Sequence, residues 1–363
     1  MKTSLSRRDF IKTGSMALLG ATIAMNSGRQ LFAATSPTSF SPIRFAVISD
    51  PHVDIKGENK MKMSAYSVEC LQRTVDEINR EEGLSFVMAN GDLLQDGEFE
   101  NAKVVRDALR SLKTKSFVIS GNHDYEPAKP EKRRDGFTYM KTADFVKYFN
   151  GHGYDGSGKH YYAKDIVPGL RMLTLDACVP EEKRWGGNLP EEQLVWLDEQ
   201  LSSHPGQVHL VFMHHNFIPW TVDELRGGPK KWFCVDNAPA VRAVLEKNIE
   251  STPIAVSGHR HIGLHARQLN KVNYFVVPSL NSHPMRYAVF TVTPEAISWK
   301  TPMVPVSEAK HLEAREALLN STWWRDEQYK KRTAANDMRV LELYENNSMV
   351  IGSRPLQEAG REA

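Results

Sequence analysis

The chain has 363 residues, of which 41% are hydrophobic and 25% are charged, as is typical of a globular protein with a substantial core. These values exclude broad disorder and allow one large domain or two moderate ones. The formal net charge is +2, and it falls to about −2 without the five basic residues and one acidic residue of segment 1–33. A slightly acidic protein is a poor candidate for bulk nucleic-acid binding, which normally requires a strong basic excess.

Segment 1–33 has the pattern of a targeting signal and is set aside from the fold prediction. The stretch "SRRDFIK" (6–12) precedes a short apolar segment (16–25) and then small residues, so we place cleavage after Ala33 or Ala34. The paired arginines resemble a twin-arginine export signal, which implies the twin-arginine export machinery as a partner and a periplasmic or exported location. The alternative is an uncleaved membrane-tethering helix. The apolar segment falls short of the ~20 residues that span a bilayer, so we expect no stable membrane span.

Polar residues that can bind a metal follow the first strand-like run of the chain. The stretch "IRFAVISDPHVD" contains a β-branched and aromatic run, Phe45 to Ile48, that predicts a buried strand ending near Asp50 and His52. These two residues are two apart and point the same way in extended chain. A carboxylate and an imidazole on one side can chelate a metal, although a turn cap beside a chance histidine explains the pair equally well.

Four further strand-like runs end in the same way, and this recurrence favours a shared site. The runs are 84–89, 117–119, 208–213 and 254–256, and they lead into Asp92, then Asn122, His123 and Asp124, then His214 and His215, and finally His259 and His261. Helical patterns lie between runs, over 66–79, 100–112 and 189–201. Alternating strands and helices predict a mainly parallel sheet, whose ligand site lies beyond the carboxyl ends of the strands. Glycines 91, 121 and 258 would permit close backbone approach there.

The ordered set D-x-H, G-D, G-N-H-D, H-H and G-H-x-H over residues 50–261 resembles the calcineurin-like metallophosphoesterase superfamily. The resemblance implies an α/β fold, a four-layer α/β/β/α metallophosphoesterase sandwich with a two-metal site at the sheet edge, over a domain at 43–305. It also implies two divalent or trivalent metal ions, of Mn, Fe or Zn, with ligands suited to them. One ion would be held by Asp50, His52 and His261, the other by Asn122, His214 and His259, and Asp92 would bridge them.

The resemblance implies an exported hydrolase that cleaves a small phosphate-ester substrate by attack of a metal-bound hydroxide. His123 would donate a proton to the leaving group, with Asp124 orienting its imidazole. His215 would lie behind the ligands or face the substrate, and we favour the position behind them. His283, after another strand-like run, is a candidate substrate contact.

The sequences of the motifs are most similar to those of the bacterial cyclic-nucleotide and glycerophosphodiester phosphodiesterases, so phosphate diesters are the expected substrates. Asn216 and Phe217 depart from the two prolines expected after the histidine pair. The tyrosine ligand of purple acid phosphatases would fall at Gln95, which argues against that branch. A phosphomonoesterase and a non-catalytic metal-dependent binding protein are the alternatives. Basic clusters at 131–136 and 226–232 are surface loops or rim an anionic-substrate pocket.

Residues 306–363 are predicted as a C-terminal extension of a helix and a hairpin. The composition of 307–336 is helical, and "RVLELYENNSMVIGS" (339–353) is typical of a hairpin with its turn at "ENN". Before the extension, 286–292 and 296–304 predict two strands that complete a second sheet. The three cysteines match no zinc pattern.

Overall fold

The computed structural model describes residues 39–180, 186–220, 233–321, 341–346 and 349–356. The predicted export signal therefore lies outside the described residues, as does the second basic cluster. Residues Ser36–Ala363 form one compact unit, in which the predicted C-terminal extension is not a separate body. Two six-stranded sheets make up the centre of this unit.

The first sheet has the strand order β12-β11-β10-β1-β2-β3. Its strands are β1 Ile43–Ile48, β2 Leu84–Asn90, β3 Ser116–Ile119, β10 Ala288–Val292, β11 Ala296–Lys300 and β12 Ile351–Pro355. The strands β1, β2 and β3 are parallel, with Phe45 beside Phe86. The other pairs are antiparallel. The carboxyl ends of the three parallel strands consequently meet at one edge of the sheet.

The second sheet has the order β4-β5-β6-β7-β9-β8. Its strands are β4 Tyr162–Val167, β5 Leu170–Leu175, β6 Val208–Met213, β7 Pro253–Ser257, β8 His265–Leu269 and β9 Val272–Val276. The four central strands are parallel, and β4 and β8 pair antiparallel at the two margins. The predicted strands that carry motifs are all present, each within two residues of its expected bounds.

Aromatic side chains join the two sheets face to face. Phe45 stacks on Phe86 and on Phe290 within the first sheet, with ring centroids 4.8 and 5.1 Å apart. Phe212 of the second sheet meets the edge of Phe45 at 6.0 Å, and Phe275 meets Phe290 at 5.4 Å. All five rings are almost fully buried. Burial of this much aromatic surface, with edge-to-face contacts, is a strong stabilising term.

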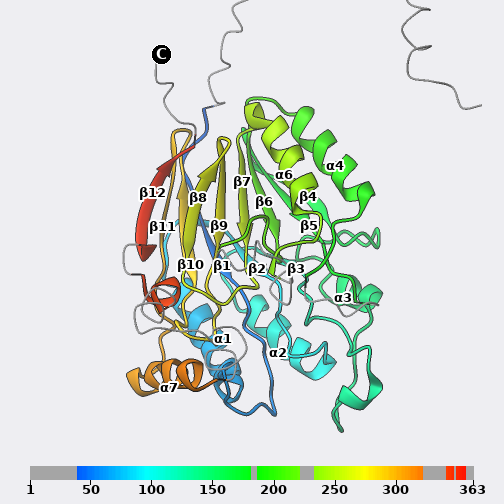
Figure 1. Cartoon of the computed structure of the whole chain (residues 1–363), viewed down its shortest axis with the longest axis vertical. Coiled ribbons are helices and arrows are strands. Elements are labelled where there is room, and N and C mark those ends of the chain that lie inside the picture. Colours follow the sequence, from blue (N-terminus) through cyan, green and yellow to red (C-terminus); the bar gives the residue numbers. More distant parts are fainter. Residues whose placement is uncertain (1–38, 181–185, 221–232, 322–340, 347–348, 357–363) are drawn as a thin grey trace, which may run out of the picture. The chain divides into compact units, whose positions relative to one another are not determined.

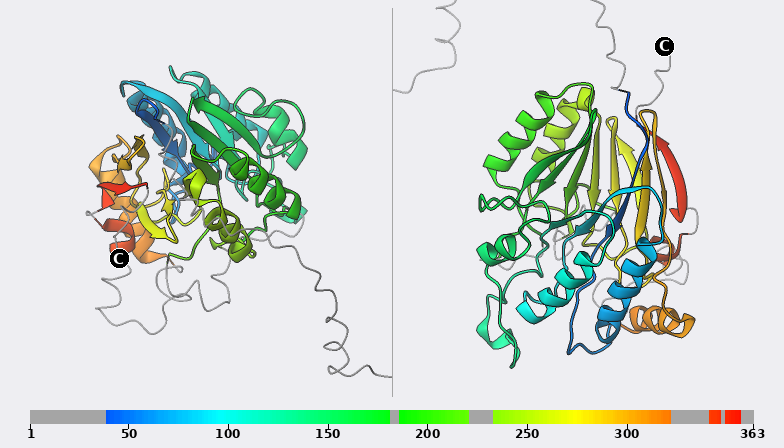
Figure 2. Two further views of the ribbon diagram at one scale, coloured as in Figure 1. Left: turned by 90° about the horizontal axis from the view of Figure 1, so that it is seen from above. Right: turned by 180° about the vertical axis from the view of Figure 1, so that it is seen from behind.

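Helices cover the outer face of each sheet, which gives the predicted four layers (Figures 1 and 2). Along β6, Leu210 and Phe212 belong to the core between the sheets, whereas Val211 and Met213 pack with helices on the other face. This period of two explains why the strand is apolar throughout, since both of its faces are covered. The helices are α1 Ser67–Ile78, α2 Phe99–Arg110, α3 Thr142–Tyr148, α4 Glu191–Ser202, α6 Ala238–Lys247 and α7 Glu308–Asn320.

The C-terminal segment differs from the predicted hairpin. Residues 341–345 are helical, and β12 pairs antiparallel with β11 rather than with the preceding segment. Gly352 lies directly against Trp299, whose indole nitrogen donates a hydrogen bond to the carbonyl of Met349. The unpaired edge of β11 thus provides the partner for β12, while Tyr344 packs with the second core and also borders a cavity. The hairpin prediction was wrong because the alternation of apolar and polar residues in a short segment does not show which other segment it will pair with.

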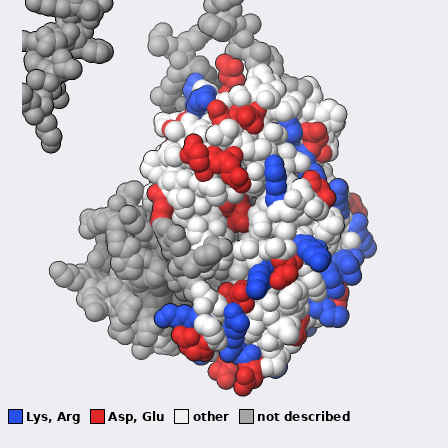
Figure 3. Space-filling model, turned by 90° about the vertical axis from the view of Figure 1, so that its right-hand side faces the viewer, with Lys and Arg blue, Asp and Glu red and all other residues white. Residues whose placement is uncertain are grey.

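Charged groups of both signs are interspersed on the face of the molecule seen in Figure 3. In the first basic cluster, Arg134 pairs with Asp54 and Glu98 at 2.9 and 2.7 Å, and Arg133 pairs with Glu126 at 2.6 Å. These two arginines therefore hold loops together. Among the described residues, no helix is long and apolar enough to cross a membrane.

A buried histidine in β6 makes the stability of the fold sensitive to acid. Burial lowers the pKa of His209 to about 4 from an ordinary value of 6.5, and its Nδ1 donates a hydrogen bond to the Ser251 carbonyl at 2.8 Å. Below pH 6.5 the unfolded chain binds a proton that the folded protein does not bind until about pH 4. Stability is therefore lost as the pH falls through this window.

We predict that His209→Asn reduces this acid sensitivity, because the Asn amide keeps a donor near Ser251 but does not titrate. Between pH 7.5 and pH 5, the wild-type protein should lose about 2 kcal/mol more unfolding free energy than the variant. Urea unfolding at the two pH values, with the same metal content in both proteins, measures the difference. Equal losses would show that another group controls acid stability.

Candidate metal centre

The predicted ligands meet where the carboxyl ends of two sheets face each other. Residues from the loops after β1, β2 and β3 of the first sheet meet residues from the loops after β6 and β7 of the second. Each loop follows a strand that is buried along most of its length. The side chains are thus held by the two rigid sheets, as a preorganised site requires.

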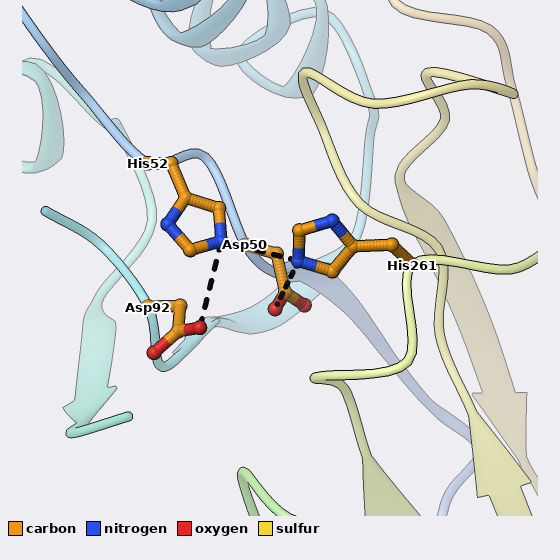
Figure 4. A group of neighbouring side chains, drawn as sticks. All are labelled: Asp50, His52, Asp92 and His261. Atoms are coloured by element: carbon orange, nitrogen blue, oxygen red, sulfur yellow. Dashed lines mark hydrogen bonds and ion pairs between the residues drawn. The ribbon is translucent and has the colours of Figure 1, made fainter. Parts of the chain in front are cut away.

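The first group consists of Asp50, His52, Asp92 and His261, whose ligand atoms all lie within 4.8 Å of one another (Figure 4). Nε2 of His261 lies 3.0 Å from Oδ1 of Asp50 and 3.1 Å from Nε2 of His52. Nε2 of His52 is 3.5 Å from Oδ2 of Asp92. The four donors point toward one small volume, as a cation site requires.

The second group shares Asp92 with the first and adds His214 and His259, again with ligand atoms within 4.8 Å of one another. Nε2 of His214 lies 3.2 Å from Oδ2 of Asp92, and its Nδ1 donates a hydrogen bond to the Asn90 carbonyl at 2.9 Å. That bond leaves Nε2 as the atom that can bind a metal. Membership of both groups agrees with the bridging position predicted for Asp92.

Asn122, the third ligand predicted for the second metal ion, carries a buried oxygen atom. Oδ1 of Asn122 is buried and has no hydrogen-bond partner among the described residues. A buried polar atom without a partner is costly, and metal coordination would satisfy it. Oxygen and imidazole donors of this kind suit Mn, Fe or Zn, so the residues fit the two ions that the motifs implied.

The electrostatics of the site agree with this assignment. Burial by itself raises the pKa of Asp92, but His214, His123 and His52 outweigh burial and hold the pKa well below its usual value. Burial, together with Lys62, lowers the pKa of His52 well below its usual value. An ionised carboxylate and a neutral imidazole are the forms that bind metals.

His214 responds to the two buried carboxylates in the opposite sense. Burial favours its neutral form, but the charges of Asp92 and Asp50 raise the pKa of His214 to about 10. A proton on His214 supplies positive charge to those carboxylates, and a bound cation would supply the same charge. We infer that metal binding releases this proton.

The backbone carries strain at the ligands. Nine non-glycine residues among those described have positive φ, and five of them are predicted ligands. The ligands and their φ values are Asp50 51°, His52 39°, Asp92 50°, His259 67° and His261 50°. Such conformations persist only where surrounding structure enforces them, and they are concentrated at functional sites.

Two of the predicted glycines are required by close packing around the carboxylates. A Cβ at position 121 would lie 2.3 Å from both the backbone nitrogen and Oδ1 of Asp92. A Cβ at position 258 would lie 2.1 Å from Oγ of Ser49 and 2.7 Å from Oδ2 of Asp50. Only glycine allows the loops to approach the ligands this closely.

His123 lies beside the predicted ligands, with its ring centroid 4.8 Å from that of His52, but Asp124 has different partners from those we expected. The Asp124 carboxylate accepts hydrogen bonds from the backbone N–H groups of Leu94 and Gly121 at 2.9 and 2.7 Å, and it thereby shapes the loop. Nδ1 of His123 instead donates to the Gln95 carbonyl at 2.7 Å and lies 3.3 Å from Asp96. Because Asp124 is directed at two backbone donors, orientation of the imidazole is assigned to residues 95 and 96.

Lys62 is a site residue that the sequence analysis missed. Its Nζ lies 3.1 Å from Nδ1 of His52 and 3.5 Å from Nε2 of His123. The lysine belongs to a loop that forms a bridge to Ser282, far away in the sequence. No local motif marks it, because "NKMKMS" resembles any charged loop. Arg260, between two predicted ligands, is 3% exposed and also lines the site.

The two weaker candidates occupy different positions. His215 is fully buried and packs on the ring of His259, with centroids 4.6 Å apart, which agrees with a place behind the ligands. His283 lines the cavity beside the ligands, and its Nε2 donates a hydrogen bond to Glu345 at 2.8 Å. Its predicted role as a substrate contact remains a prediction.

The fold and site define a class of protein, and comparison with known families agrees. Residues 43–263 match the calcineurin-like phosphoesterase family, and the chain belongs to this family. A dimetal phosphatase from Danio rerio has the same fold, with a TM-score of 0.56 and 17% identity over 71% of this chain and 95% of that one.

Two curated relatives are bacterial phosphodiesterases. The probable glycerophosphodiester phosphodiesterase GpdQ of Arcobacter nitrofigilis is 25% identical over 46% of this chain and 55% of its own length. The 3',5'-cyclic adenosine monophosphate phosphodiesterase CpdA of Haemophilus influenzae is 27% identical over 49% of this chain and 57% of its own. The chain thus spans a little over half the length of these relatives.

The shared position of Asp92 leads to a prediction about metal content. Asp92→Ala should lose both ions, because it removes a ligand from each group and leaves buried imidazoles without their carboxylate. Metal analysis by mass spectrometry after dialysis against Mn²⁺ or Zn²⁺ measures this loss. Asp107→Ala, at a carboxylate half-exposed on α2, is the matched control and should retain both ions. Retention of one ion by Asp92→Ala would contradict the bridging role.

Proposed function

We propose that this protein is an exported two-metal phosphodiesterase in which His123 protonates the leaving alcohol. The observation that supports a diester most directly is the position of His123 between two cavities. Both cavities are lined by this residue together with a predicted ligand, Asp92 in the first and Asn122 in the second. A diester carries an alcohol on each of two phosphate oxygens, and this arrangement offers a place for each alcohol.

The two cavities differ in chemistry. The first has a volume of about 210 Å³, and four of the residues that line it beside the ligands are Met61, Phe233, Leu318 and Tyr344. The second has a volume of about 280 Å³ and contains the polar residues Gln95, Asp96, Glu126 and Lys132. A substrate with one apolar and one polar alcohol would match both environments.

The chain's own residues supply the proton chemistry. When bound, two metal ions would lower the pKa of a water molecule and neutralise charge on the phosphate. Nδ1 of His123 is held by the Gln95 carbonyl and Asp96, so Nε2 is the nitrogen available to the leaving oxygen. A general acid must hold its donor nitrogen within hydrogen-bond reach of the leaving oxygen, and this fixed ring orientation meets that requirement.

Lys62 adds a second positive group on the same side. Its Nζ lies 3.5 Å from Nε2 of His123, close enough for both groups to reach one phosphate or leaving-group oxygen. Charge stabilisation of this kind is worth most in a site from which water is excluded. The names of the two curated relatives, a glycerophosphodiester and a cyclic adenosine monophosphate phosphodiesterase, also support a diester substrate.

Two alternatives have weaker support. A phosphomonoesterase would use extra cations for the terminal phosphate, for which Lys62 is a candidate, but Arg133 is engaged with Glu126 and Lys230 lies outside the described residues. A non-catalytic binding protein would not need a proton donor held as His123 is. Export is proposed from the paired arginines of segment 1–33 alone, with the twin-arginine machinery as the partner.

The preference for diesters is tested by comparing bis(p-nitrophenyl) phosphate with p-nitrophenyl phosphate. With Mn²⁺, Fe²⁺ or Zn²⁺ added to the metal-free protein, we expect kcat/KM for the diester to be at least about tenfold higher. Faster cleavage of the monoester would favour the phosphatase alternative. No cleavage of either ester by protein shown to hold two ions would favour the binding protein.

The role of His123 is tested by varying the leaving group. His123→Ala should retain both ions and lower kcat by about 10²- to 10⁴-fold for esters of alkyl alcohols. The loss should be much smaller for nitrophenyl esters, whose leaving groups need no proton. His152→Ala, a histidine remote from the metal ligands that bonds to Ser116, is the control. Equal losses for both classes of ester would contradict the proton-donor role.

A further inference from the structure

The C-terminal extension contributes part of the wall of the first cavity. Leu318 of α7 and Tyr344 of the helical segment 341–345 line it together with Met61 and Phe233. We propose that this wall binds the leaving alcohol of the substrate, and that this alcohol is flat and apolar, of the aryl or arylmethyl class. The inference rests on the proposed phosphodiesterase function and assigns each alcohol to one cavity.

The orientation of His123 assigns the leaving alcohol to the first cavity. Nδ1 faces Gln95 and Asp96, which line the second cavity. Nε2 faces Lys62, which lines the first. A proton delivered from Nε2 therefore goes to an oxygen on the side of the first cavity, and the departing alcohol occupies that cavity.

Tyr344 is held in place by the surrounding side chains and backbone. Its ring stacks on His283 with centroids 6.4 Å apart and an interplanar angle of 29°. The adjacent Glu345 carboxylate accepts hydrogen bonds from His283 at 2.8 Å and from Arg315 at 2.5 Å. The Leu343 carbonyl accepts the N–H of Gly263 at 2.8 Å. The segment is thus attached to the loop that follows the ligand His261, and its ring is preorganised.

Phe233 is fixed on the side of the second metal group. The guanidinium of Arg260 lies 4.1 Å from the centroid of its ring, and the ring of His259 meets it at 5.7 Å. The Phe233 carbonyl accepts a hydrogen bond from the N–H of Asn216 at 2.9 Å. Proline at position 216 could not donate this bond. The departure from the expected proline pair therefore helps to position the Phe233 backbone.

The size and composition of the cavity favour one flat alcohol. Its volume of about 210 Å³ is below the ~300 Å³ at which pockets for drug-sized ligands begin, so it suits a single group. The two aromatic side chains, Phe233 and Tyr344, provide surfaces for stacking, and Leu318 and Met61 provide aliphatic contacts. Among the described residues that line it, Asp92 is the only carboxylate, and it belongs to the candidate metal centre. A small polyhydroxy alcohol would leave its hydroxyl groups poorly matched against this wall.

The test compares benzyl methyl phosphate with ethyl methyl phosphate, by chromatographic measurement of released benzyl alcohol or ethanol. These leaving alcohols have similar intrinsic reactivity, so a difference reports binding by the wall. With the metal-loaded protein, we expect kcat/KM for benzyl release to exceed that for ethyl release by at least about tenfold. Equal rates, or faster release of ethanol, would overturn the proposal.

Substitutions in the wall should change this ratio. Tyr344→Ala and Leu318→Ala should each lower the benzyl-to-ethyl ratio by about fivefold or more, and Tyr344→Phe should retain it. Leu312→Ala is the matched control, because Leu312 lies on the same helix α7 but is 54% exposed. An unchanged ratio in folded Tyr344→Ala and Leu318→Ala would overturn the assignment of the wall.

A binding measurement separates this proposal from the proposed function. Methyl (2-phenylethyl)phosphonate replaces the ester oxygen with a methylene group and cannot release the alcohol. Calorimetry with the metal-loaded protein should show at least about tenfold tighter binding than for methyl propylphosphonate. If neither ester is cleaved but this preference is found, the phosphodiesterase function fails and the apolar wall is supported. Equal affinities would overturn the wall whether or not the esters are cleaved.

Discussion

The burial of two carboxylates at the candidate metal centre determines which groups must surround them. Asp50 and Asp92 are at most 1% exposed, and burial of two negative charges is costly unless positive charge compensates for it. Imidazoles from both sheets surround the pair at 3.0 to 3.8 Å. The same arrangement is a ready site for cations, which would provide the compensating charge more completely than the protonated imidazole of His214 does.

This constraint accounts for local features that are unfavourable elsewhere. Positive φ at five ligands and glycine at the two positions of closest approach bring donors from both sheets into one volume. The aromatic core between the sheets stabilises the fold that holds this strain, with Phe45 in contact with rings of both sheets. Stability and function are thus connected through the strands, whose buried faces pack the core and whose ends present the ligands.

The C-terminal extension connects the rim of the fold to the metal site. Its strand β12 extends the first sheet, whereas α7 and the segment 341–345 reach the cavity beside the ligands. The metal site of this family is built from short motifs. Added segments such as these can therefore change which alcohol fits the neighbouring cavity without changing the metal site. Function of this kind belongs to the individual site rather than to the fold.

Sequence alone determined the motif-bearing strands, three of the helices between them and the candidate metal ligands, because apolar periodicity and polar strand ends are local signals. Tertiary structure decided which side chains and segments contact one another. The Asp124 carboxylate accepts hydrogen bonds from two backbone amides rather than orienting His123. Residues 341–345 form a helix where a hairpin was expected. Lys62 lies in the site although its loop carries no motif. Each of these depends on a contact between distant segments, and the spacing of residues along the chain does not specify which segments will meet.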